Sequence, residues 1–504
     1  LYGSNATAGV ISITTKRGAR DGFVFGGSGE GGSNGTYQLS AFMRGGGEGF
    51  YMSFSATGRR DGGFDVSGDP GGSDDQDENV TLNGRLNVDL TEALSIGGTF
   101  RFTDRESDFD QFNFGAADVA GLVTDANNFV QQTEIFGSVN ADLVTFGGRV
   151  VHGFRLDYTD VTSTNFTAGV ASSDVESERY RAAYQATIAL DAPRLEEADH
   201  QITLAGEWER EGFRNVNPTL VFDPSQLIKQ DRTLFGVAGE YRGNFFNDLD
   251  VQFGGRYDIN DEFENAFSYS VGVSYFLDAT DTRFHGSVGT GASNPTFFEQ
   301  FGFIPGTFIG NPDLEPETNF GWDIGAEQTF WQDRIVVDVT YFRERLKDEI
   351  ATPTFVTPVN QTGTSRRQGF EIAASIEPIS GLTIAGNYTW LDASNPDGST
   401  EVRRPQHEGG VNIAYSFLEG RASLGADGRF VFGNVDTDFT APAFGTTVTS
   451  LDDYFLLDLN GSYQMTDKVQ LTARIENVTD TDYEELDGFE TRGITGFAGV
   501  RVSF

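Results

Sequence analysis

Nine aspartates gather in two neighbouring stretches of the chain, and their carboxylates have the chemistry of a calcium site. The stretch RRDGGFDVSGDPGGSDDQD contains Asp61, Asp65, Asp69, Asp74, Asp75 and Asp77, and the next polar stretch adds Asp108, Asp110 and Asp125. Calcium takes six to eight oxygen ligands, which flexible loops with clustered carboxylates and glycine turns can supply. The spacing lacks the Gly and terminal Glu of an EF-hand. The expected ligands are Asp65, Asp74, Asp75, Asp77, Asp110 and Asp125.

Solvated charge is the alternative interpretation of these aspartates, because the whole chain is acidic. It has 75 Asp and Glu against 35 Lys and Arg, a net charge of −40. Such a surface repels phosphate backbones, so we expect no nucleic-acid partner.

Five phenylalanines fall within the 12-residue stretch FFEQFGFIPGTF. They are Phe297, Phe298, Phe301, Phe303 and Phe308. In an external loop they could close over an apolar ligand as a substrate-binding surface. They could equally pack on one another as the core of the loop, and both interpretations stay open.

No catalytic constellation stands out elsewhere. The four histidines are scattered, without HExxH or His-x-His spacing, and no Ser–His–Asp order is visible. The chain has no cysteine, which excludes disulfides and thiolate metal sites. The sequence therefore predicts that the protein is not an enzyme.

Segments with a period of two residues run along almost the whole chain and predict strands. In VQLTARIENV, apolar side chains such as Leu471 alternate with polar ones such as Gln470. By the same alternation, Ile96 and Val337 belong to the apolar face, and Ser95 and Val336 to the opposite one. A soluble β-sandwich would bury such apolar faces against each other, whereas an outer-membrane barrel exposes them to lipid.

The lengths of the gaps between strands distinguish these two folds. The alternation places 22 strands, and every second gap is short. Nine of the eleven others have 13 residues or more, among them 59–78, 106–129, 159–176, 212–230 and 291–317. Short periplasmic turns alternating with long external loops are typical of an outer-membrane barrel. We therefore predict an all-β fold, a 22-stranded antiparallel transmembrane β-barrel spanning residues 19–504. Barrels of this width belong to transporters with a plugged lumen.

Three short motifs carry a resemblance to the TonB-dependent outer-membrane receptors. The opening LYGSNATAGVISITTK resembles the end of that family's plug domain, GNPDLEPET resembles its NPDLKPE box, and IENVTDTDYEE resembles its segment before the last strand. The motifs stand in the family's order around the 22-strand pattern. The resemblance implies that residues 1–18 end a plug domain and that the chain is a fragment of a longer receptor.

The resemblance also implies function, location and partners. Members of the family use the TonB complex to import a scarce nutrient, such as a ferric siderophore or cobalamin, across the outer membrane of Gram-negative bacteria. Outer-membrane lipid and lipopolysaccharide would surround the barrel. Acidic loops in cobalamin receptors of this family bind calcium, as expected here for the aspartates. A passive porin-like channel and a structural or adhesive surface barrel are the alternatives, and neither needs a plug segment.

Overall fold

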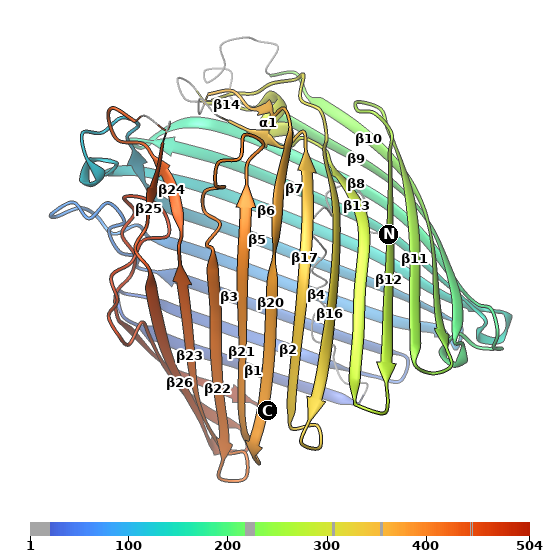
Figure 1. The fold of residues 1–504 in the computed structure, drawn as a ribbon. Helices are drawn as coiled ribbons and strands as arrows, with labels where there is room; N and C mark the ends of the chain where they lie inside the picture. The colour runs from blue at the N-terminus through green and yellow to red at the C-terminus, as the bar shows by residue number, and fades with distance from the viewer. Residues whose placement is uncertain (1–20, 217–226, 305–307, 353–355, 444, 446) are drawn as a thin grey trace.

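A single closed β-barrel accounts for most of the molecule (Figure 1). The structure is a computed structural model that describes residues 21–216, 227–304, 308–352, 356–443, 445 and 447–504. Within these residues, 22 strands form one antiparallel sheet, and β1 (Gly22–Gly32) pairs with β28 (Thr495–Ser503) to close it. The predicted fold class is thus confirmed. The expected plug segment, residues 1–18, lies outside the described residues.

The other strands of the barrel follow one another around the sheet in chain order. The first half comprises β2 (Tyr37–Gly47), β3 (Phe50–Asp61), β4 (Asp77–Thr91), β5 (Leu94–Phe112), β6 (Val123–Thr145), β7 (Val150–Thr167), β8 (Val170–Ala189), β9 (His200–Asn215), β10 (Gln230–Phe245) and β11 (Leu249–Asn260). The second half comprises β12 (Ala266–Leu277), β13 (Thr282–Ser293), β16 (Glu317–Phe330), β17 (Ile335–Lys347), β20 (Thr364–Ile379), β21 (Leu382–Ser394), β22 (His407–Phe417), β23 (Ala422–Phe432), β26 (Tyr454–Thr466) and β27 (Val469–Glu476).

Short elements decorate the loops. They are the helix α1 (Phe297–Phe301), the strand pairs β14 (Phe303–Ile304) with β15 (Phe308–Ile309), β18 (Ile350–Ala351) with β19 (Val359–Asn360), and β24 (Val435–Asp438) with β25 (Thr447–Ser450), and the 3₁₀ turns η1 (Val119–Gly121), η2 (Phe146–Gly148) and η3 (Leu195–Glu197). In the part of the chain that the structure describes, no helix is long and apolar enough to cross a membrane.

The two faces of the sheet differ as the sequence predicts. Ile96 and Leu471 are exposed on the outer face, each in a row of apolar neighbours. Leu471 stands between Tyr463 and Val500 on the adjacent strands. Since an isolated soluble barrel would not expose such a continuous apolar band, the outer face is the one that contacts lipid.

The two ends of the barrel differ in the length of their connections. In Figure 1, tight turns join the strands at the lower end, whereas α1, β14, β24 and β25 lie toward the opposite end. Short turns mark the periplasmic end of an outer-membrane barrel and long loops its external end. The expected ligand-binding residues therefore belong to the external end.

Strands β5 to β8 are longer than the sequence predicted, and two predicted loops are wrong in extent. The loop expected at 106–129 shrinks to residues 113–122, so Asp108 and Asp110 lie on β5 and Asp125 lies on β6. The loop expected at 159–176 is only the turn at 168–169. These strands extend beyond the apolar band, where both faces meet water and the alternation of polar and apolar residues disappears.

Candidate ligand-binding face

The acidic loop between β3 and β4, residues 62–76, is tied to the external ends of β5 and β6. Asp125 Oδ1 accepts hydrogen bonds from the backbone N and the Oγ of Ser73, at 2.7 and 2.6 Å. Asp110 Oδ1 accepts a bond from the backbone N of Ala126 at 3.0 Å. Its other oxygen, Oδ2, is buried without a hydrogen-bond partner, and the residue is only 8% exposed. An orphaned carboxylate oxygen is costly unless a ligand or proton satisfies it.

Asp75 is the most perturbed carboxylate of this loop. Burial raises its pKa to about 6, and the negative charges of Asp110, Asp65 and Asp108 add to the shift. A hydrogen bond from the backbone N of Val66, 3.2 Å from Asp75 Oδ2, opposes the shift only in part. Three carboxylates thus act on a fourth in a partly desolvated place, which favours a proton or a cation there.

The structure brings some of the predicted calcium ligands together and separates others. Asp110 lies within electrostatic reach of Asp65, Asp75 and Asp125, and Asp75 also lies within reach of Asp65. Asp77 forms an ion pair with Arg105, with 2.6 Å between Asp77 Oδ2 and the guanidinium, and Asp74 is exposed. Among the described residues, no three His, Cys, Asp or Glu side chains are arranged to hold a metal ion.

A small hydrophobic core joins four external segments that are distant in the sequence. Leu122, Val123 and Phe439 are buried at its centre, and Val66, Phe112, Ala116 and Phe489 pack around them. Backbone hydrogen bonds add links: Gly115 N to Phe439 O at 2.7 Å, and Glu490 N to Val66 O at 3.0 Å. We call the segments 62–76, 113–122, 433–443 and 477–494 the external loop assembly. Sequence reasoning missed it, although isolated phenylalanines in polar gaps were a signal.

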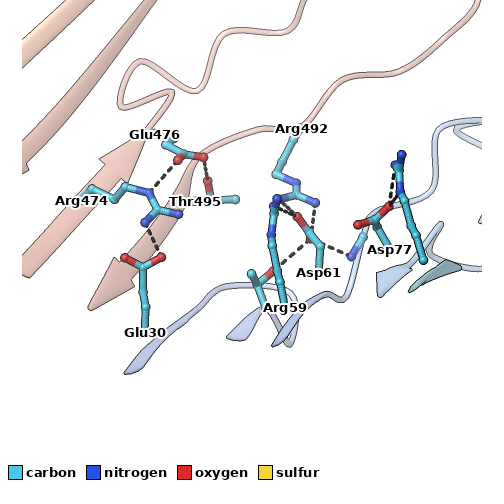
Figure 2. Close-up of polar contacts among 11 residues, drawn as sticks. Glu30, Arg59, Asp61, Asp77, Arg474, Glu476, Arg492 and Thr495 are labelled. Atoms are coloured by element: carbon cyan, nitrogen blue, oxygen red, sulfur yellow. Dashed lines mark hydrogen bonds and ion pairs between the residues drawn. The ribbon is translucent and has the colours of Figure 1, made fainter. Parts of the chain in front are cut away.

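One buried carboxylate anchors this external loop assembly to the barrel. Asp61, the last residue of β3, is 8% exposed and accepts bonds from Arg492 Nη2 at 2.7 Å and Arg59 Nη2 at 2.8 Å. Thr36 Oγ1 and the backbone N of Gly63 also donate to it, at 3.0 and 3.1 Å. Figure 2 shows Arg492 reaching Asp61 from the last external loop.

A second group of charged side chains, centred on Arg474, lies near Asp61 at the seam between the first and last strands. The guanidinium of Arg474 bridges Glu30 of β1 and Glu476 of β27, with 2.8 Å to Glu476 Oε1 (Figure 2). The same guanidinium lies 3.8 Å from the centre of the Phe497 ring. Side chains from β1, β27 and β28 are thus joined where the barrel closes.

The phenylalanine-rich loop contains a short, capped helix. Thr296 Oγ1 accepts a bond from the backbone N of Glu299 at 3.1 Å, and the Glu299 carboxylate accepts one from the backbone N of Thr296 at 2.7 Å. This reciprocal capping box satisfies two donors at the start of α1. Asn311 Nδ2 donates to the carbonyl of Pro358 at 3.0 Å, which links this loop to the next one.

Most of the predicted phenylalanines pack within this region. Phe298 stacks on Phe308 with 4.6 Å between ring centres, and Phe297 stacks on Phe213 of β9 at 5.9 Å. The guanidinium of Arg232 lies 4.4 Å from the centre of the Phe297 ring. These contacts favour the interpretation that Phe297, Phe298 and Phe308 form the core of the loop.

Phe301 lies 6.3 Å from Phe297 between ring centres and also lines a cavity of about 300 Å³. Its lining also includes Phe213, Ile228, Gln300 and Pro312. The cavity is therefore largely apolar, with the two amides of Gln230 and Gln300 in its lining. The side chain of Phe303 lies outside the described residues.

Comparisons with known proteins agree with this architecture. Residues 17–478 match the model of the family described as "TonB dependent receptor-like, beta-barrel". The vitamin B12 transporter BtuB of Photobacterium profundum is 24% identical over 526 residues, covering the whole chain and 78% of that protein. BtuB of Vibrio vulnificus is 27% identical over 44% of this chain and 33% of its own length.

Solved structures show the same fold at low identity. The siderophore receptor PirA of Acinetobacter baumannii has a TM-score of 0.80 at 15% identity, covering all of this chain and 83% of that one. The ferric enterobactin receptor PfeA of Pseudomonas aeruginosa, as a mutant with enterobactin, has a TM-score of 0.81 at 16% identity, covering all of this chain and 84% of that one. The chain therefore belongs to the TonB-dependent receptor-like β-barrel family, whose members lie in the outer membrane of Gram-negative bacteria.

Proposed function

We propose that this chain is the barrel of a receptor that captures cobalamin outside the cell and imports it with energy delivered by the TonB complex. The observation that carries the proposal is the external loop assembly, which holds buried carboxylates in place over one side of a closed 22-strand barrel. The whole-chain similarity to a vitamin B12 transporter supports cobalamin as the ligand. No catalytic step is part of this function.

A ferric siderophore is the second candidate. The largely apolar cavity beside Phe301 and Phe213 favours a ligand that carries aromatic or apolar groups. Binding there would use the phenylalanine loop rather than the acidic loop. The two candidates thus engage different loops of the same face, and variants of each loop distinguish them.

We also propose that the acidic loop binds calcium before it binds the nutrient. The donor set fits, because carboxylate oxygens are the ligands that calcium prefers. Asp110 contributes a buried oxygen without a partner, and Asp75 is held among three other carboxylates. Of the expected ligands, Asp65, Asp75 and Asp125 are the carboxylates whose charges act on or with Asp110, so calcium would have to draw these four closer together, whereas Asp77 would first have to leave Arg105.

Calcium should protect the acidic loop from proteolysis, because a bound cation would cross-link residues 62–76 to β5 and β6. Asp75→Asn with Asp110→Asn should abolish this protection, whereas the control Asp77→Asn should keep it. The measurement is the rate of limited proteolysis in calcium and in chelator, with cobalamin affinity measured in parallel. Identical rates for the unmodified protein in calcium and in chelator would show that the aspartates are only solvated charge.

The same protection should weaken as the pH falls from 7 to 5. The pKa of Asp75 is raised in the folded protein, so the folded loop holds more protons than the unfolded chain between pH 4 and 6. Without calcium, the loop therefore loses stability as the pH rises through that window. A cation competes with the proton, so calcium should bind best above the raised pKa. Protection that is equal at both pH values would contradict the role given to Asp75.

A deletion strain tests the proposed import. When cobalamin is the limiting nutrient, the strain should lose growth, and a protonophore or loss of TonB should reproduce the defect in cells that keep the receptor. A panel of ferric siderophores as limiting iron sources tests the second candidate in the same cells. Uptake at the same rate with and without the protonophore would indicate a passive channel. Altered attachment with normal uptake of every nutrient would indicate a structural barrel.

A further inference from the structure

Four hairpin turns at the periplasmic end carry a bulky apolar residue at their first position, with little protein around it. They are Phe146 between β6 and β7, Phe246 between β10 and β11, Trp331 between β16 and β17, and Leu418 between β22 and β23. Their exposed fractions are 81%, 88%, 54% and 60%, respectively. If these turns lay in water, the exposure of such large apolar side chains would be unfavourable in free energy.

The backbone at these four positions disfavours the residues found there. Their φ angles are 52°, 59°, 53° and 53° in the same order, all in the left-handed region. Side chains with a Cβ are strained in that region, and glycine and asparagine are the usual residues in such turns. The chain uses those residues at the second position of two of these turns, Gly147 and Asn247, but not at the first. Turn geometry therefore does not explain the bulky residues.

The four turns are regularly spaced around the barrel. Counted over the barrel strands of the described residues, they follow strands 6, 10, 14 and 18, so they recur at every fourth strand. The next position in this series is the seam, where Phe504 is exposed at the end of the chain. The turns between these positions begin with polar or small residues, such as Asp278 and Ser380, except the longer connection between β8 and β9, which begins with Leu190 at 41% exposure.

We propose that these turn tips are lipid anchors, which insert into the boundary between headgroups and acyl chains of the periplasmic leaflet and fix the depth of the barrel. Aromatic and apolar side chains at this boundary stabilise membrane proteins. Trp331 has the guanidinium of Arg334 at 5.4 Å from its ring centre, which places beside the ring a cation able to pair with a lipid phosphate. The occupant is thus phospholipid, and the proposal is independent of the imported nutrient.

Neighbouring residues of one turn provide a matched test. Leu418 and Glu419 both have left-handed φ angles, of 53° and 58°, so asparagine relieves backbone strain at either position. Only Leu418→Asn removes an apolar side chain. In phospholipid vesicles, Leu418→Asn should lower the denaturant midpoint of unfolding, while Glu419→Asn should leave it unchanged or raise it. A midpoint that rises for both variants would overturn the proposal, since both sites would then be merely strained turns. Trp331→Asn and Gln332→Asn repeat the comparison in a second turn.

Fluorescence quenching tests the depth of Trp331 directly. The emission lost on Trp331→Phe substitution isolates this residue from the other tryptophans of the chain. That emission should be quenched by phospholipid brominated near the headgroup and largely protected from iodide in the water. Full quenching by iodide, with none by brominated lipid, would place the tip in the periplasm and overturn the proposal. Because the vesicles contain no other protein, quenching by lipid also excludes a periplasmic partner as the occupant.

Discussion

Lysine at Ile96 or Leu471 should destabilise the barrel by about 1–2 kcal/mol, because each places a charge against lipid, two residues inside a strand that begins at a periplasmic turn. Such a charge costs about 2–4 kcal/mol at the bilayer midplane and about 0–1 kcal/mol near the interface. Both side chains are exposed on the apolar outer face. Lysine at the adjacent Ser95 or Gln470 should have little effect, since these residues face the wet lumen. Denaturant titration in phospholipid vesicles measures the free energy of unfolding for each variant.

The two substitution sites within each pair, such as Leu471 and Gln470, have closely matched surroundings. Leu471 pairs with Val500, and Gln470 pairs with Arg501 on the same neighbouring strand. The two substitutions therefore share strand, depth and partner strand, and differ only in the face. Val337→Lys against Val336→Lys repeats the test with two valines, where the lost side chain is identical. Equal destabilisation on both faces would contradict the register of the barrel.

The strands of the barrel could be predicted because lipid and water impose opposite demands on successive residues. Leu471 and Gln470 illustrate a pattern that repeats wherever a strand crosses the apolar band. Beyond that band both faces of the strand meet water, so polar and apolar residues no longer alternate. The segment TDRESDFDQF at the end of β5 therefore has the composition of a loop, although it continues the strand to Phe112. The turn at Ala168–Gly169 was missed for the same reason, since polar residues flank it on both strands.

The candidate site could be predicted only in part, because its contacts depend on register and on distant loops. The sequence indicates that Asp75 and Asp110 belong to one acidic region. It does not indicate that Asp77 pairs with Arg105, since that needs the alignment of β4 with β5. The contact of Phe112 with Phe489 joins segments more than 370 residues apart, and no local pattern predicts it.

Asp61→Ala should destabilise the protein by about 3 kcal/mol, because removal of one partner leaves the other charge of a buried ion pair uncompensated. Arg492 would lose both of its bonds to the carboxylate, at 2.7 and 3.3 Å, and Thr36 Oγ1 would lose its acceptor. The loop 477–494 should then detach from residues 62–76, with faster hydrogen exchange in both. Ligand affinity should fall with it, since the external loop assembly would no longer be fixed to β3.

Arg59→Gln is the matched control, because Arg59 donates to the same carboxylate from an exposed position. Exposed ion pairs contribute about 0–1 kcal/mol, so this variant should fold and bind almost normally. The double variant Asp61→Ala with Arg492→Ala should lose less than the sum of the single losses, because neither charge is then left alone. If Arg59→Gln cost as much as Asp61→Ala, or the double variant were strictly additive, the Asp61–Arg492 pair would not be the contact that anchors these loops.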